Sequence, residues 1–260
     1  MNPLTVPRSN AREVERVFTL QAPPEAVWRA LTNAAELMRW FPPEARVTPG
    51  AGGAIWMKWA TLGYEAESPI EAWDPGRHLR CTFPLHGPVR LSTDFYLEGN
   101  QGKTILRVVT SGFGEGEDWD QWFDGVGSGW DFELRSLKHY LERHRGEDRT
   151  TLAVPVAIDP PATRAWDRLA GGASAWLSFD EPPVEGARYR SRTATGELLT
   201  GMVEQWHPPR QAVLTVDQFN DALMRIEVER PEGAIIWLAA WNVAEGVLSA
   251  LETRWKASVT

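Results

Sequence analysis

The chain has 260 residues, 43% hydrophobic and 24% charged, which excludes wholesale disorder and suits one large domain or two modest ones. The formal net charge of -8 excludes a broadly basic nucleic-acid binder. A single cysteine excludes an intrachain disulfide framework and a cysteine-rich zinc site. The sequence shows no apolar leader with a basic flank and no membrane-spanning apolar run, so we expect a cytoplasmic protein without a membrane span.

The first predicted elements are a strand and two short helices. Apolar side chains alternate over residues 13–20, which predicts a strand. Pro23 and Pro24 end this strand and suit the first turn of a helix around Trp28. A second short helix follows, for which Asn33 is the predicted N-cap.

Five strand-like runs come next, and turn signals rich in Gly, Pro, Asp and Asn separate them. Alternating apolar residues in most of these runs predict an antiparallel sheet with one buried face. The runs cover residues 54–60, 64–73, 77–83, 89–97 and 104–110. The turns contain Gly63, Asp74-Pro75-Gly76, His86-Gly87-Pro88 and Gly99-Asn100-Gln101-Gly102.

The apolar spacing then changes from two residues to three and four, which predicts a long amphipathic helix. Its apolar stripe consists of Trp119, Phe123, Val126, Trp130, Leu134, Leu137 and Leu141. The start of this segment is acidic and its end is basic, as the helix dipole favours. Gly125, Gly127 and Gly129 each cost about 1 kcal/mol relative to Ala, so we expect an irregular first turn.

The second half of the chain repeats motifs of the first. Residues 70–77 (IEAWDPGR) match residues 203–210 (VEQWHPPR). A Pro-Pro pair precedes Trp28 in the first half and Trp166 in the second. The Gly-Ala pairs at residues 53–54 and 186–187 are separated by the same number of residues as segments 70–77 and 203–210. Chance similarity of Pro- and Trp-rich strings is the alternative, but three matches in the same order favour a duplicated unit.

We therefore predict two domains, residues 1–146 and 150–260, joined by a short charged linker over 143–149. The closing helix of the second domain is shorter than that of the first. Its apolar positions are Ala244, Leu248, Leu251 and Trp255. In this trimmed copy we expect little or no cavity.

Residues 27–41 (VWRALTNAAELMRWF) resemble the helical hallmark of the START-related, birch-pollen-allergen-like superfamily, SRPBCC. More narrowly, residues 71–79 (EAWDPGRHL), 110–113 (TSGF) and 129–141 resemble the branch of heat-shock-protein-90 ATPase activator homologues. The resemblance covers roughly residues 13–144, and the second half matches mainly through the repeat. It implies an α+β fold of tandem helix-grip domains, each a curved antiparallel sheet wrapped around a long C-terminal helix.

Many proteins of this superfamily have an apolar cavity between the sheet and the long helix, and the resemblance implies the same for the first domain. The apolar faces of the predicted elements supply the candidate ligand-binding residues, although the same side chains could fill a solid core. The pattern does not determine which face of strand 54–60 points inward. The candidates are Trp56, Leu79, Cys81, Phe83, Phe95, Leu106, Val108, Trp122, Val126 and Trp130.

No constellation of catalytic or metal-ligating residues stands out. The five histidines form no cluster at ligand spacing, and Cys81 alternates with Leu79 and Phe83 as a small apolar residue does. We therefore expect no metal and no cofactor, and a binding protein more than an enzyme. The favoured function is binding of a hydrophobic small molecule, a lipid or an aromatic metabolite. The alternatives are a cyclase- or aromatase-like enzyme that uses polar groups in the pocket, and a chaperone-related module with a protein partner.

Overall fold

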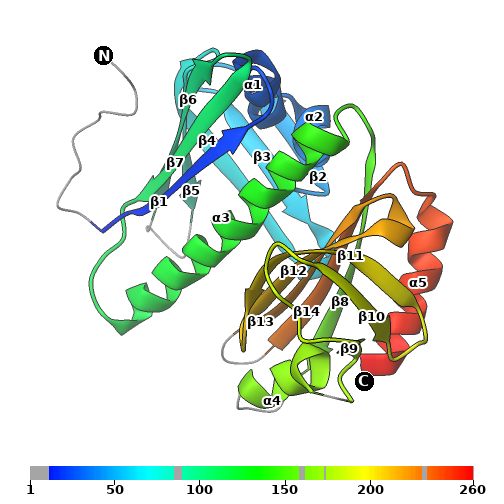
Figure 1. The fold of residues 1–260 in the computed structure, drawn as a ribbon. Helices are drawn as coiled ribbons and strands as arrows, with labels where there is room; N and C mark the ends of the chain where they lie inside the picture. The colour runs from blue at the N-terminus through cyan, green and yellow to red at the C-terminus, as the bar shows by residue number, and fades with distance from the viewer. Residues whose placement is uncertain (1–11, 85–89, 158–161, 173, 230–232, 260) are drawn as a thin grey trace. The chain divides into compact units, whose positions relative to one another are not determined.

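The computed structural model describes residues 12–84, 90–157, 162–172, 174–229 and 233–259. The chain divides into two compact units, Met1–Gly146 and Glu147–Thr260. Each unit contains a seven-stranded antiparallel sheet, short helical segments after its first strand and a long C-terminal helix (Figure 1). The predicted fold class, tandem helix-grip domains of the α+β type, is confirmed.

The first unit begins with a strand and two short helices, continues with six strands and ends with the long helix. Its sheet has the order β1-β7-β6-β5-β4-β3-β2, and all neighbouring strands are antiparallel. The elements are β1 (Val14–Leu20), α1 (Pro24–Thr32), α2 (Ala34–Met38), β2 (Glu44–Thr48), β3 (Ala54–Trp59), β4 (Tyr64–Asp74), β5 (His78–Pro84), β6 (Arg90–Asn100), β7 (Lys103–Ser111) and α3 (Glu117–Arg143).

The short helices form where their end signals predict. Pro24 lies in the first turn of α1, where its missing N–H costs no hydrogen bond. Asn33 caps α2, because its side-chain oxygen accepts a hydrogen bond from the backbone N–H of Glu36 at 3.1 Å. Both predictions are confirmed. Strand β2 was not predicted, because none of its side chains is fully buried and apolar alternation is therefore weak.

Helix α3 is continuous through its three glycines, so the expected irregular first turn is wrong. Gly127 has a packing reason. A Cβ at this position would lie 3.1 Å from Nη2 of Arg16, which donates a hydrogen bond to the Gly127 carbonyl at 3.3 Å. The Arg16 guanidinium also pairs with Asp131 one turn further along, with Nε 2.5 Å from Oδ1 and Nη2 2.9 Å from Oδ2. These contacts tie β1 to α3. The predicted turn at His86-Gly87-Pro88 lies outside the described residues.

The second unit repeats the topology of the first. Its sheet has the order β8-β14-β13-β12-β11-β10-β9, which is the order of the first sheet with every number raised by seven. The elements are β8 (Arg149–Ala157), α4 (Ala162–Trp166), the π-helical turn η3 (Asp167–Gly171), β9 (Leu177–Phe179), β10 (Arg188–Thr193), β11 (Leu198–His207), β12 (Gln211–Val216), β13 (Ala222–Glu229), β14 (Gly233–Trp241) and α5 (Glu245–Val259). The internal repeat is thus a repeat of fold.

A β-bulge recurs at the same place in both sheets. The strand register shifts between Ile70 and Ala72 in β4, and between Val203 and Gln205 in β11. Both bulges lie inside the matched sequence segments. Because a bulge sharpens the bend of a strand, its recurrence supports a common curvature of the two sheets.

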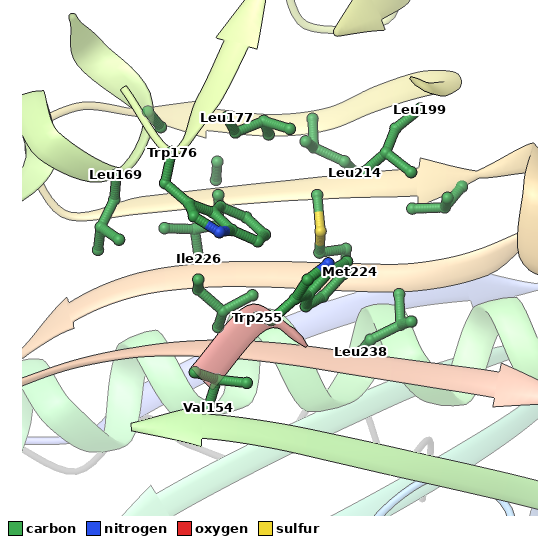
Figure 2. Packing of buried hydrophobic residues seen from close by; sticks show 14 of the residues in the cluster. Val154, Leu169, Trp176, Leu177, Leu199, Leu214, Met224, Ile226, Leu238 and Trp255 are labelled. Atoms are coloured by element: carbon green, nitrogen blue, oxygen red, sulfur yellow. The ribbon is translucent and has the colours of Figure 1, made fainter. Parts of the chain in front are cut away.

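The core of the second unit lies between its sheet and α5 (Figure 2). The rings of Trp176 and Trp255 meet edge to face there, with centroids 4.9 Å apart. Helix α5 buries Leu248, Leu251 and Trp255 of the predicted apolar face, whereas Ala244, the fourth predicted position, lies before the helix and is exposed. No helix among the described residues is both long enough and apolar enough to cross a membrane.

Candidate functional site

The interior of the first unit is lined by apolar side chains from α1, α2, the segment that follows α2 and the inner face of the sheet. The remaining void is about 20 Å³, which is room for about one water molecule. Its lining consists of Leu31, Leu37, Trp40, Phe41, Ile55, Met57, Leu79, Cys81, Phe83 and Phe95. In this conformation the predicted cavity is almost filled by side chains.

Four predicted site residues line this void: Leu79, Cys81, Phe83 and Phe95. Two more lie beside them on the same face of the sheet, because Val108 is paired with Phe95 and Leu106 with Leu97. Both β7 side chains are fully buried.

Trp130 of α3 closes the interior from the helix side. Its ring centroid lies 5.5 Å from that of Phe95 and 6.0 Å from that of Phe41. Its indole Nε1 donates a hydrogen bond to Oγ1 of Thr110 at 3.0 Å, and that hydroxyl lies 2.9 Å from Oγ1 of Thr93. This chain of buried hydrogen bonds determines the position of the Trp130 ring. Val126, about one turn earlier on α3, is partly buried.

Two predicted site residues are not in the interior. Trp56 lies on the opposite face of β3, where its Nε1 donates to Oε1 of Glu65 at 2.8 Å and its ring stacks under the Arg46 guanidinium. Its neighbours Ile55 and Met57 point inward instead. The placement of Trp56 in the cavity is therefore corrected, and the reason is that both faces of β3 carry large apolar side chains.

Trp122 is the second correction. It lies in the first turns of α3, where few side chains are fully buried, and is 39% exposed. Six lining residues were absent from the prediction: Leu31, Leu37, Trp40, Phe41, Ile55 and Met57. The apolar stripe of residues 27–41 was the signal that could have identified the first four.

The lining of the interior is chemically inert. Cys81 is its one ionisable side chain among the described residues. Burial, with smaller contributions from the charges of Glu71 and Asp94, raises the pKa of the Cys81 thiol to about 12. The thiol is therefore neutral at physiological pH and acts as a small apolar group.

The polar groups of the same strands lie on the other face of the sheet. Nε2 of His78 is 2.7 Å from Oδ1 of Asp94, and Nη1 of Arg80 is 3.3 Å from Oδ2 of the same carboxylate. Arg80 also pairs with Glu71, with Nε and Oε2 2.9 Å apart. His78 and Arg80 alternate with the inward residues Leu79 and Cys81, so this ion-pair cluster does not reach the interior.

The surface of the first unit also carries a groove of about 880 Å³ between α1, the β4–β5 turn and β6. Trp28 and Leu97 are its buried apolar residues. Its exposed side chains include both Glu25 and Arg77, so the groove has no strong charge of one sign.

The second unit contains a pocket of about 190 Å³, which corrects the expectation of little or no cavity in this copy. The pocket lies where η3, the loop before β9 and the last turn of α5 meet the end of β8. Small and medium-sized side chains make up most of its lining, so a gap remains beside Trp176. Its lining consists of Val156, Ala165, Arg168, Leu169, Ser174, Trp176, Ala194, Ser258 and Val259.

A comparison with solved structures finds similar folds. Protein MLL2253 from Mesorhizobium loti is 26% identical, with 51% of this chain and 98% of that chain covered and a TM-score of 0.46. The Aha1 dimer from Colwellia psychrerythraea is 21% identical over 52% of this chain and 99% of that chain, with a TM-score of 0.47. The di-domain ARO/CYC BexL of the BE-7585A biosynthetic pathway is 20% identical over 95% of this chain and 98% of that chain, also with a TM-score of 0.47.

A search of curated proteins finds no match. Among protein-family models, the one described as "Activator of Hsp90 ATPase homolog 1-like protein" matches residues 21–142. This range runs from the end of β1 to the end of α3 and contains the motifs on which the predicted resemblance rests. The first unit therefore contains a domain of the activator of Hsp90 ATPase homolog 1-like type, within the SRPBCC superfamily, and the second unit repeats its helix-grip architecture.

Proposed function

We propose that the first unit binds a hydrophobic small molecule, a lipid chain or an aromatic metabolite, between the sheet and α3. The observation that carries this proposal is the composition of the interior. Its described lining is apolar throughout, and its one ionisable group is a neutral thiol. Such a surface excludes water and favours apolar partners over charged ones.

Ligand entry requires a side chain to move, because the void of about 20 Å³ is too small for an organic molecule. Trp130 is the side chain that we expect to move. It leaves one hydrogen bond, worth about 1 kcal/mol, and two aromatic contacts, worth about 0.5–1.5 kcal/mol each. The resulting cost of about 2–4 kcal/mol weakens binding roughly 30- to 800-fold relative to a preformed cavity.

The composition of the lining supports binding over acid–base catalysis. A cyclase- or aromatase-like mechanism needs ionisable groups that face the substrate. The ionisable side chains of β4 to β6 described above pair with one another on the outer face of the sheet. The second alternative, a protein-interaction module, uses the surface and does not need ligand entry at all.

The test is a titration of the full chain with long-chain fatty acids and planar aromatic compounds, followed by thermal unfolding. The key variant is Trp130→Leu, which removes the indole ring that closes the interior and keeps an apolar side chain. We expect it to bind the effective probe about ten-fold or more tightly than the parent chain. The matched control is Trp56→Leu, the same chemical change on the outer face, which leaves affinity unchanged. If neither the parent chain nor Trp130→Leu binds any apolar probe, the proposal is wrong.

A further inference from the structure

We propose that the second unit contains a separate binding site for a small carboxylic acid with an aromatic or branched apolar body. The site is the pocket of about 190 Å³ between η3, the loop before β9 and the end of α5. All of its lining residues belong to the second unit. The proposal therefore does not rest on ligand binding by the first unit.

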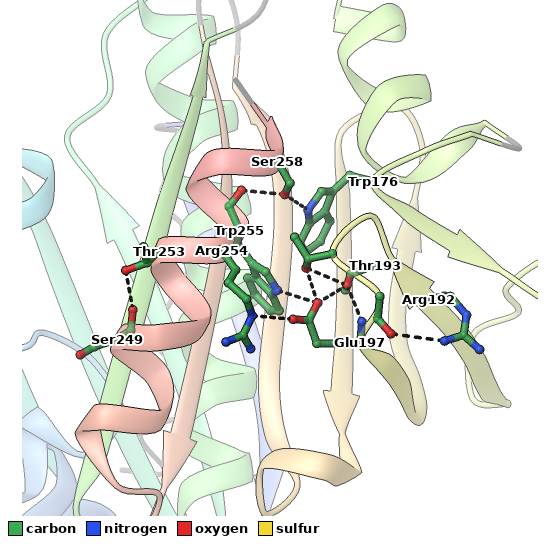
Figure 3. Close-up of polar contacts among 11 residues, drawn as sticks. Trp176, Arg192, Thr193, Glu197, Ser249, Thr253, Arg254, Trp255 and Ser258 are labelled. Carbon is green, nitrogen blue, oxygen red and sulfur yellow. Dashed lines mark hydrogen bonds and ion pairs between the residues drawn. The ribbon is translucent and has the colours of Figure 1, made fainter.

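The pocket is preorganised around Trp176. The Trp176 backbone N–H donates to the Arg168 carbonyl at 2.7 Å, and its carbonyl accepts from the N–H of Ala194 at 2.7 Å. Its indole Nε1 donates to Oγ of Ser258 at 3.0 Å, and Oγ donates in turn to the Trp255 carbonyl at 2.8 Å (Figure 3). Four lining residues are thus connected by hydrogen bonds to one another, and a ligand meets a wall that is already ordered.

A network behind Trp176 holds this wall in place. The Glu197 carboxylate accepts hydrogen bonds from the hydroxyls of Thr193 and Thr195 and, at 3.0 Å, from Nε of Arg254 (Figure 3). Nε1 of Trp255 lies 3.4 Å from the same carboxylate. Since Trp255 packs edge to face against Trp176, the network holds in place the side chain on which the Trp176 wall of the pocket rests. The Glu197 charge is balanced by Arg254, and Glu197 is not part of the lining.

The size of the pocket selects a small ligand. An engineered apolar cavity of about 150 Å³ in another protein holds benzene. A pocket of about 190 Å³ therefore holds a single ring or a short branched chain together with a small polar group. The apolar body would lie against Trp176, Leu169 and Val156, which are all buried.

The charge of the pocket selects an anion. Arg168 is the one ionisable side chain among the described residues of the lining, and its exposed guanidinium has no partner among the described side chains. Arg164, one turn earlier, is a second exposed cation, and Asp167 is the nearest acidic residue in the sequence. A carboxylate would accept two hydrogen bonds from Arg168 in the fork geometry that guanidinium groups favour. The hydroxyl of Ser174 is a further donor at the pocket.

The test uses benzoate and phenylacetate as probes and benzamide as the uncharged analogue of benzoate, all titrated into the full chain. Binding is measured by calorimetry and located by amide NMR shifts, which separate this site from the first unit. We expect saturable binding of the acids, with shifts at Trp176, Ala194 and Ser258. We expect benzamide to bind roughly ten- to hundred-fold more weakly than benzoate, because it lacks the charge-assisted hydrogen bonds to Arg168.

Three variants sharpen the test. Arg168→Gln changes an exposed side chain, so the fold survives, and we expect it to remove the preference for benzoate over benzamide. Ala194→Leu fills the pocket and abolishes binding of both probes. Arg210→Gln, which removes an exposed arginine outside the pocket, leaves both affinities unchanged. Absence of any shift at the pocket, or equal affinities for benzoate and benzamide in the parent chain, would overturn the proposal.

Discussion

Trp28 and Trp73 meet edge to face with their ring centroids 5.1 Å apart, and Trp166 and Trp206 make the same contact at the same 5.1 Å in the second unit. In each unit, one ring comes from the first short helix and the other from the strand that contains the bulge. The sequence repeat therefore preserves a tertiary contact as well as a motif. Such a pair fixes the position of the helix on the sheet.

The first prediction concerns this pair. We expect Trp28→Leu and Trp73→Leu to destabilise the first unit non-additively, with a coupling energy of about 0.5–1.5 kcal/mol, because either change removes the same aromatic contact. Chemical unfolding of the two single variants and the double variant measures it. The control is the double variant that combines Trp28→Leu with Trp206→Leu, a substitution in the other unit. Additive effects of Trp28→Leu and Trp73→Leu would contradict the assignment.

The second prediction concerns the hydroxyl of Thr110. Thr110→Val keeps the shape of the side chain but leaves the buried indole N–H of Trp130 without its acceptor. We expect a loss of about 1–3 kcal/mol in the unfolding free energy of the first unit. Thr110→Ser retains the hydroxyl and removes only the methyl group, so we expect a smaller loss of unfolding free energy than in Thr110→Val. Equal losses in the two variants would show that the hydrogen bond contributes little.

The third prediction concerns Cys81. Burial raises its pKa to about 12, and the thiolate is the reactive form, so iodoacetamide should not label the native chain near pH 8. Labelling should be complete after unfolding in guanidinium chloride, which serves as the positive control. Mass spectrometry measures both states. Rapid labelling of the native chain would show that the interior opens readily, and an apolar ligand that slows this labelling would support the proposed function.

The fourth prediction concerns Glu197 and pH. Burial alone would raise the pKa of Glu197, but hydrogen bonds from Thr193, Thr195 and Arg254 outweigh it and lower the pKa from 4.5 to about 2. The folded state thus binds this proton less readily than the unfolded state. The stabilisation is present above about pH 4.5 and is lost as the pH falls towards 2.

Glu197→Gln removes the titrating group and should flatten this part of the pH profile of the second unit. Urea unfolding at a series of acidic pH values measures the profile. Glu204→Gln, a substitution elsewhere in the same unit, is the control because none of the hydrogen bonds to Glu197 described above involves Glu204. An unchanged slope in Glu197→Gln would contradict the assignment.

The fifth prediction concerns the close approach of β11 and β12. A Cβ at Gly201 would lie 2.0 Å from the Thr215 carbonyl oxygen, which also accepts a hydrogen bond from the Tyr189 hydroxyl at 2.8 Å. Gly201→Ala must push these strands apart, and we expect destabilisation by about 1–3 kcal/mol or more. Gly233→Ala in β14 meets no atom within 4 Å and is the matched control. Differential scanning calorimetry compares the two variants.

The local elements were predictable because their signals lie in short stretches of sequence. The three- and four-residue spacing of apolar side chains predicts α3 without reference to the elements that pack against it, and Asn33 caps α2 through an atom of its own side chain. The duplication was also readable, since matched segments must adopt matched strands and turns. These features need no knowledge of which other element each face contacts.

Which side chains face the site, and whether they fill it, depended on tertiary structure. Strand β3 has large apolar residues on both faces, so alternation alone cannot show that Ile55 and Met57 point inward and Trp56 outward. The same limit applies to cavities. Apolar side chains from distant segments fill the first interior around Trp130 and leave a gap beside Trp176 in the second unit. Whether such groups fill a space depends on how their volumes and rotamers fit together, and only the assembled fold determines that.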